Sequence, residues 1–246
     1  MKIFLAGTAS HEQIVIQHCP LYVLESYYYF KPWQIELIKK SEMFLLDSGA
    51  FTFLQNAKAH VDWDRYIENY AEFINQNNVK YFFELDIDAI VGYSKIVDFR
   101  EKLERLTQKK CIPVWHRNRG YQEYLRLCEL YDYIAIGGIA IKEIKPVEYP
   151  IFTRLIKDAH ERNCEVHGLG FTKQNELKRY RFDSVDSTTW LNGDRFGELH
   201  FFNGKKIERI TAAGRNQRLK ASKTKDATMH NYNEWLKFQR YAKEGL

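Results

Sequence analysis

Three aspartates, Asp47, Asp86 and Asp186, each stand where an apolar run of the sequence ends. An apolar run that stops at an acidic residue is typical of a buried strand leading into a functional loop. Carboxylates that share a dry pocket acquire different pKa values, so one can stay ionised as a nucleophile while another holds a proton. Glycosidic-bond chemistry requires that division of labour.

Three further apolar runs end in glycine or histidine, at His116, at Gly137-Gly138 and at His167. Parallel strands present their carboxyl ends at one end of a barrel, so we expect six strand ends to converge on one site. Because His116 precedes Arg117 and Arg119, these three side chains and His167 are candidates to contact a base or a phosphate. A histidine satisfied inside the core is an equally good interpretation of His116 and His167.

Strand-like and helix-like segments alternate along the chain, which predicts parallel strands joined by helical crossovers. The expected fold is a (β/α)8 TIM-type barrel. A doubly wound sheet is the weaker alternative, because no Gly-x-Gly-x-x-Gly follows the first strand. The segment 21–30 is ambiguous between strand and loop. Strands are expected at 2–8, 43–47, 81–86, 111–116, 133–137, 165–170 and 184–188, and helices at 32–40, 61–77, 94–109, 121–130, 146–163 and 173–180.

The pattern changes near residue 197, which predicts a catalytic barrel at 1–196 and a basic extension at 197–246. The extension is expected to hold a hairpin at 198–210, turning at Asn203-Gly204, and a helix at 230–243. From Asn203 to the end there are eleven Lys/Arg and four Asp/Glu, a balance of +7, which leaves −2 for the rest of a chain with net charge +5. A loop is expected at 215–225. Its five cations would contact a nucleic-acid backbone, or would merely be solvated: Arg215, Arg218, Lys220, Lys223 and Lys225.

Composition excludes several classes of protein. A hydrophobic fraction of 45% with 15% aromatic residues excludes a disordered chain. No apolar stretch approaches the roughly 18 residues of a membrane span, and the apolar start of the chain is too short for a secretory signal. We therefore expect a cytoplasmic protein. The four cysteines lack the spacing of a zinc site and are expected to be free thiols.

Three segments resemble the tRNA-guanine transglycosylase superfamily. Asp47-Ser48-Gly49-Ala50-Phe51 is similar to its Asp-Ser-Gly-Gly-aromatic motif, and Gly137-Gly138-Ile139-Ala140 is similar to its glycine-pair loop. The segment 182–187 resembles the region that carries the nucleophile, with Asp186 at the matching position. The resemblance covers roughly residues 43–190 and is closest to the small phage and bacterial DNA 7-deazaguanine transglycosylases.

The resemblance implies a covalent mechanism with two catalytic carboxylates. Asp186 would attack the sugar C1′ and form a glycosyl-enzyme while guanine departs. Asp47 would act as general acid and then as base, when an incoming 7-deazaguanine of the preQ0 type restores the bond.

The resemblance also implies a base pocket. Asp86 would accept hydrogen bonds from guanine, with Asp88 as its rival for this role. Phe51 would stack on the base, next to Ser48 and Gly49. The amides of Gly137 and Gly138 would approach the base oxygen.

The chain departs from the tRNA enzymes in lacking their C-x-C-x-x-C and later histidine, so we expect no zinc and no other cofactor. It also has Ala50 in place of a second glycine and no Pro-Thr-Arg after the nucleophile. The expected substrate is therefore DNA rather than tRNA. The alternatives are a tRNA-type enzyme acting on RNA, a metal-dependent barrel hydrolase using the aspartates with His116 or His167, and a non-catalytic nucleic-acid-binding subunit. The oligomeric state is not predicted.

Overall fold

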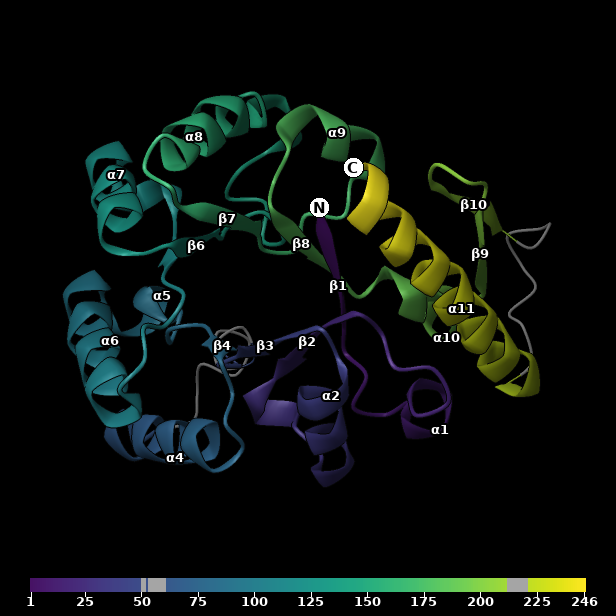
Figure 1. The fold of residues 1–246 in the computed structure, drawn as a ribbon, viewed down its shortest axis with the longest axis horizontal. Coiled ribbons are helices and arrows are strands. Elements are labelled where there is room, and N and C mark those ends of the chain that lie inside the picture. The colour runs from purple at the N-terminus through teal and green to yellow at the C-terminus, as the bar shows by residue number, and fades with distance from the viewer. Residues whose placement is uncertain (50–51, 53–60, 212–220) are drawn as a thin grey trace.

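Eight parallel strands form one curled sheet, as the computed structural model shows for residues 1–49, 52, 61–211 and 221–246 (Figure 1). The strand order is β4-β3-β2-β1-β8-β7-β6-β5. The two outer strands approach each other through a parallel bridge between Phe83 and Ile112. The all-parallel strands and the flanking helices are TIM-like, which agrees with the expected fold at this coarser level. The strands are β1 (Lys2–Ala6), β2 (Tyr22–Ser26), β3 (Met43–Asp47), β4 (Tyr81–Phe82), β5 (Val114–Trp115), β6 (Tyr133–Ile136), β7 (Glu165–Gly168) and β8 (Ser184–Ser187).

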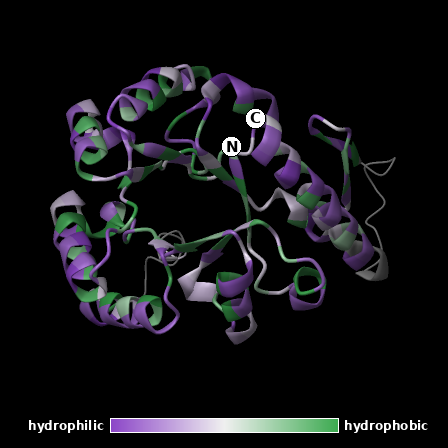
Figure 2. Cartoon of the chain, viewed as in Figure 1, coloured by the Kyte–Doolittle hydropathy of each residue, from purple (hydrophilic) through white to green (hydrophobic). Residues whose placement is uncertain are grey.

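Helices surround the sheet, and the longer ones pack an apolar face against it (Figures 1 and 2). In α4, the buried residues Ile67, Tyr70 and Ile74 recur at helical spacing, and the Asp62 carboxylate accepts a hydrogen bond from the Arg65 amide at 3.1 Å to cap the helix. The α-helices are α1 (Glu12–Val15), α2 (Ile35–Lys40), α4 (Trp63–Gln76), α5 (Asp88–Val91), α6 (Tyr93–Thr107), α7 (Tyr121–Leu130), α8 (Ile151–His160), α9 (Gln174–Tyr180), α10 (Asn192–Phe196) and α11 (Ala221–Gly245).

Strands β4 and β5 are shorter than the sequence predicts. The amide of Val114 donates to the Glu84 carboxylate at 2.9 Å instead of to a neighbouring strand. Pro113, just before it, has no amide hydrogen to contribute to a ladder. A buried side chain therefore replaces ladder bonds where the two edges of the sheet meet. The ambiguous segment 21–30 resolves into β2 followed by a 3-10 turn (Tyr27–Tyr29).

The expected extension is present as a hairpin and a helix, with two corrections. Strands β9 (Glu198–Phe202) and β10 (Ile207–Thr211) pair antiparallel with Phe202 opposite Ile207, so the turn has four residues rather than two. The Asn203 side chain makes this turn by accepting from the amides of Lys205 and Lys206, at 3.0 Å each.

The loop expected at 215–225 is wrong for residues 221–225, which belong to α11. Close packing of this helix on α10 gives the reason. A Cβ on Gly193 would lie 2.7 Å from the Thr228 amide, so the two backbones touch. The amino-terminal half of α11 is thus held at Thr228 by a tertiary contact, which leaves no apolar periodicity in the sequence.

Helix α11 joins the extension to the amino ends of the barrel strands. The buried Gln239 side chain accepts from the Leu21 amide at 2.7 Å and donates to the carbonyls of Ile3 at 2.7 Å and Tyr22 at 2.8 Å. The Met1 amine donates to two carbonyls of the same helix end, Ala242 and Leu246, at 3.1 Å. These bonds attach the extension to β1 and β2.

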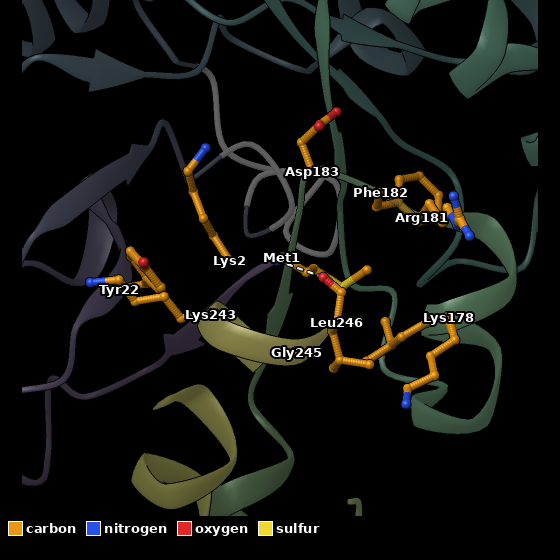
Figure 3. Close-up of a pocket in the computed structure, with 11 residues that line it drawn as sticks. Met1, Lys2, Tyr22, Lys178, Arg181, Phe182, Asp183, Lys243, Gly245 and Leu246 are labelled. Atoms are coloured by element: carbon orange, nitrogen blue, oxygen red, sulfur yellow. Dashed lines mark hydrogen bonds between the residues drawn. The ribbon is translucent and has the colours of Figure 1, made fainter. Parts of the chain in front are cut away.

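A hollow of about 690 Å³ lies at this amino end of the barrel, beside the chain termini (Figure 3). Several of its charges are paired within the protein. Lys2 bonds Glu165 at 2.8 Å, and Lys243 bonds Glu42 at 2.7 Å. Asp183 accepts from the Val166 amide at 2.7 Å. Contacts within the protein therefore account for these three charged side chains.

Two other expectations concern the cysteines and the membrane. Cys19, Cys111, Cys128 and Cys164 are free thiols, as predicted. Within the described ranges of the chain, no helix is both long and apolar enough to cross a membrane.

We predict that Gln239→Leu lowers the free energy of unfolding by about 3 kcal/mol, because it leaves buried backbone groups of three residues without partners. Urea denaturation measures this change. Arg240→Gln, at the exposed neighbouring position, is the matched control and is expected to be neutral. Equal stability of both variants would contradict the role of Gln239 as the attachment point.

Candidate active site

A cavity of about 870 Å³ lies at the carboxyl ends of the strands, at the end of the barrel where TIM-like folds carry their chemistry. Asp47 and Asp186 line it from β3 and β8, together with Glu25 from β2. The sequence therefore placed both expected catalytic aspartates in one cavity. Its size is in the range of small-molecule sites, about 300–1,000 Å³.

Asp47 is held by a tight turn that its own motif forms. Its Oδ2 accepts a hydrogen bond from the Gly49 amide at 2.9 Å. Gly49 has φ +85°, and a Cβ there would lie 2.6 Å from the Cβ of Tyr28. Only glycine fits this position. The Ser48 carbonyl accepts from the Tyr66 hydroxyl at 2.5 Å, so the Asp-Ser-Gly motif has a structural role as well as an aspartate in the cavity.

Burial raises the pKa of Asp47 to about 6, even though the Gly49 amide opposes the shift. The negative charges of Asp86 and Asp186 raise the pKa further. Asp86 and Asp186 are thus each close enough to Asp47 for their charges to act on it. Of the three expected aspartates, Asp47 and Asp186 line the cavity, whereas Asp86 is not among its lining residues. A carboxyl with this pKa exchanges a proton readily near neutral pH, which suits a general acid and base.

Two groups contact one oxygen of Asp186. Its Oδ1 accepts from the Gly170 amide at 2.5 Å and lies 3.3 Å from Nε2 of His167. His167 is fully buried beneath it. Of the two interpretations that the sequence left open for His167, the structure favours the core residue, because its ring lies in the interior of the barrel and packs against Phe4 and Phe83.

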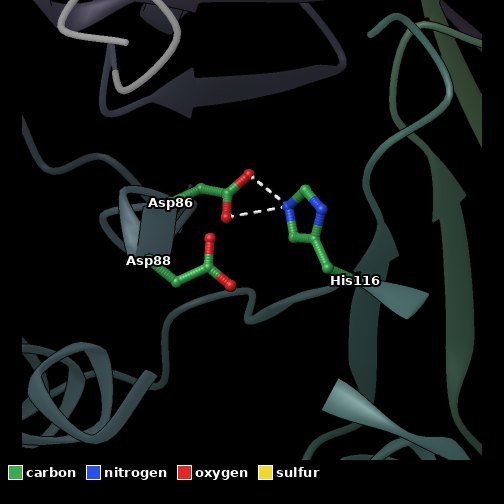
Figure 4. A group of neighbouring side chains, drawn as sticks. All are labelled: Asp86, Asp88 and His116. Atoms are coloured by element: carbon green, nitrogen blue, oxygen red, sulfur yellow. Dashed lines mark hydrogen bonds and ion pairs between the residues drawn. The ribbon is translucent and has the colours of Figure 1, made fainter. Parts of the chain in front are cut away.

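Asp86 belongs to a neighbouring network with His116 (Figure 4). Nε2 of His116 lies 2.8 and 2.9 Å from the two Asp86 oxygens, and Nδ1 lies 2.8 Å from Glu143. Burial alone lowers the pKa of His116, but Asp86, with Glu143, raises it to about 9. The charged imidazole therefore contributes stability below its ordinary pKa of 6.5 and loses that contribution as pH rises through about 9.

Arg119 joins this network from the interior. Its side chain is 1% exposed and pairs with Glu84 at 3.1 Å, Asp86 at 3.3 Å and Asp88 at 3.1 Å. It also lies 4.4 Å from the centre of the Tyr93 ring. Arg119 thus orients carboxylates and is too buried to contact a phosphate, which corrects that expectation.

Arg117 is half exposed and pairs with Glu148. Its position at the surface is compatible with the expected phosphate contact, which stays a prediction.

The glycine pair makes room for this network. A Cβ on Gly137 would lie 2.6 Å from Nε2 of His116. Gly138 has φ +78°, and a Cβ there would lie 2.6 Å from the Glu143 carboxylate. Contacts within the protein therefore explain both glycines, and their expected approach to a base stays a prediction.

Asp86, Asp88 and His116 place ligand atoms within 4.8 Å of one another, which is the geometry of a possible metal site (Figure 4). The electrostatics do not fit a cation there. The Arg119 guanidinium already pairs with both aspartates, and both nitrogens of His116 face carboxylates. A metal would have to displace one positive charge and remove a proton from the other.

Several expected contacts cannot be compared with the structure. Phe51, Arg215, Arg218 and Lys220 lie outside the described residues, as does the side chain of Lys223. Lys225 is exposed on α11. The base-stacking and phosphate roles of these residues stay predictions.

Two acidic residues of the site were missed in the sequence. Glu25 is 2% exposed, accepts from the Thr8 amide at 2.9 Å and has its pKa raised to about 7 by burial. It follows an apolar run, so the rule applied to Asp47 would have found it. Glu143 follows no such run, and only its contact with His116 reveals it.

Comparison with known proteins adds no relative, because no protein-family model and no curated protein matches the chain. The assignment of a function therefore rests on the geometry of the site and on the motifs.

We predict that Asp47→Asn stabilises the protein at pH 8 by about 2–3 kcal/mol, at about 1.4 kcal/mol per pKa unit. The pKa of Asp47 is raised from 3.8 to about 6, so ionising it in the folded state costs free energy that an amide does not. The gain is expected to shrink as pH falls from 6 to 4, where the folded state keeps the proton. Urea denaturation of both variants at pH 8 and at pH 4 measures the difference in the free energy of unfolding. A difference that is the same at both pH values would contradict the raised pKa of Asp47.

We also predict that Mg²⁺, Mn²⁺ and Zn²⁺ do not raise the thermal midpoint of chelator-treated protein, because a cation that binds the folded state would stabilise it by mass action. Differential scanning calorimetry decides this. A metal-dependent rise that Asp88→Asn removes would establish a metal site and refute the charge argument.

Proposed function

We propose that the protein is a base-exchanging transglycosylase that replaces guanine in a nucleic acid with a 7-deazaguanine, DNA being favoured over tRNA. The observation that carries the proposal is the shared cavity of Asp47 and Asp186, in which burial and neighbouring charge give Asp47 a pKa of about 6. One carboxyl is thereby suited to proton transfer, while the other accepts a hydrogen bond from the Gly170 amide and is suited to attack.

In the first step, an oxygen of Asp186 forms a bond to C1′ of the target nucleotide as the bond from C1′ to the base nitrogen breaks. The bonding electron pair leaves with guanine, and the Asp47 proton neutralises the departing base. The product is a glycosyl ester of Asp186, with Asp47 ionised.

In the second step, the incoming 7-deazaguanine gives the proton of its attacking nitrogen to Asp47. That nitrogen bonds C1′, and the ester bond to Asp186 breaks. Both carboxyls return to their first state, so the exchange needs no cofactor. The raised pKa of Asp47 serves both proton transfers, because the group must be an acid in one and a base in the other.

Asp86 is the proposed recognition residue for guanine. His116 and Arg119 fix its orientation, and a carboxylate has about four lone-pair sites, so acceptor capacity remains for a guanine N–H. An aromatic residue would stack on the base, and Phe51 is the proposed one. Such a pocket requires a nucleotide that is flipped out of a duplex or already single-stranded.

The metal-dependent hydrolase and the non-catalytic binder are the competing functions. The position of Arg119 between Asp86 and Asp88 opposes the first. The second predicts binding with a steep salt dependence and no turnover.

The test is incubation with DNA or tRNA and labelled guanine or 7-deazaguanine, followed by mass spectrometry for a covalent adduct. We predict that Asp186→Asn abolishes the adduct and lowers exchange about 10³-fold or more. Asp47→Asn is expected to bind base normally but lose turnover about 10²- to 10⁴-fold. Asp98→Asn, whose side chain is 64% exposed on α6, is the control and should be fully active.

If the wild-type protein incorporates neither label into either polymer and forms no adduct, the proposed function is refuted. Salt-sensitive binding that Asp186→Asn leaves unchanged would then support a binding subunit.

A further inference from the structure

A chain of buried polar groups lies beneath Asp186. His167 Nδ1 is 2.7 Å from the Ser184 hydroxyl, which is 2.5 Å from the Tyr133 hydroxyl. His167 Nε2 faces Asp186 at 3.3 Å. The four residues come from the adjacent strands β6, β7 and β8, in which His167 pairs in register with both Ala135 and Ser184.

The hydrogen-bonding capacity of each group fixes where the protons lie. If Tyr133 donates to Ser184 and Ser184 donates to Nδ1 of His167, then Nε2 carries the proton and donates to Asp186. In the reverse order Nδ1 donates to Ser184 and an unprotonated Nε2 faces a carboxylate, which brings two acceptors together. The first order satisfies every group without burying a second charge, and burial is costly for unpaired polar or charged groups.

The two donors to Asp186 fall on the same oxygen. Oδ1 takes the Gly170 amide and the His167 ring, and these are the hydrogen bonds to this carboxylate within the described part of the chain. Both contacts are on Oδ1, so the two oxygens of Asp186 have different surroundings. Asp186 also lines the cavity. Oδ2 is left as the oxygen that is free to react.

We propose that His167 is the positioning residue of the nucleophile, held as the Nε2–H tautomer by Ser184 and Tyr133. It anchors Oδ1 of Asp186 so that Oδ2 attacks C1′. The inference rests on the proposed function for its chemistry. Oδ2 bonds C1′ as the bond from C1′ to the base breaks, the electron pair leaves with the base, Asp47 supplies the proton, and His167 keeps its own proton throughout.

Nitrogen NMR of protein labelled with ¹⁵N-histidine tests the tautomer without any substrate. The His167 signals, identified by their loss in His167→Gln, are expected to show a protonated Nε2 and an unprotonated Nδ1. Ser184→Ala removes the donor to Nδ1 and is expected to mix the tautomers, while Ser184→Thr keeps the hydroxyl and the wild-type pattern. An unprotonated Nε2 in the wild type would overturn the inference.

The rate of adduct formation tests the positioning role. His167→Leu removes the donor and is expected to slow adduct formation about 10²-fold, the effect of a small misplacement of a reacting group. Guanine affinity should stay within about twofold, because the lost interaction acts on the nucleophile rather than on the bound base. His167→Gln, which keeps an N–H near Nε2, is expected to recover about tenfold.

A folded His167→Leu variant that forms the adduct at the wild-type rate would refute the role of His167. A loss of base affinity equal to the loss of rate would show general damage and refute it as well. If this variant does not fold, Ser184→Ala and Ser184→Thr undergo the same comparison. If the wild type forms no adduct, the proposed function fails, and the NMR result still decides the arrangement of protons.

Discussion

The carboxylate of Glu84 has no exposure to solvent, and the barrel wall between β4 and β5 depends on its charge being matched. One oxygen accepts from Arg100 at 2.5 Å, and the other from the Val114 amide and Arg119. An unpaired charge at this depth would cost several kcal/mol. Removing Arg100 or Arg119 would thus affect more than its own ion pair. Glu84 also accepts the hydrogen bond from the Val114 amide, which takes the place of a strand-to-strand bond where the two edges of the sheet meet.

The same constraint extends outward to the mouth of the barrel. Arg119 holds Asp86 and Asp88, Asp86 holds His116, and His116 holds Glu143. Charges alternate in sign along this path, so each group is oriented by its neighbours. These side chains are thereby held in fixed orientations, which is what a recognition surface needs.

Asp47 and Asp186 stand outside this alternation. Asp47 accepts a hydrogen bond from the Gly49 amide. Asp186 accepts one from the Gly170 amide and lies 3.3 Å from the ring of the buried His167. Burial, together with the negative charges of Asp86 and Asp186, raises the pKa of Asp47 to about 6. Ionised Asp47 therefore lowers the stability of the folded protein at the place where proton transfer is proposed. At the opposite end of the barrel, Gln239 of α11 stabilises the fold through its hydrogen bonds to Ile3 and Tyr22.

The sequence by itself determined the class of fold and the location of two key carboxylates. Alternating strand and helix patterns have few compact solutions, and residues that follow parallel strands must meet at one end, so Asp47 and Asp186 could be placed together. Tertiary structure alone decided their partners. The burial of His167 and Arg119, the contact of Glu143 with His116 and the start of α11 on Gly193 depend on pairs of residues far apart in the chain. Local periodicity carries no information about such pairs, because charge matching and close packing are satisfied only once the strands are in register.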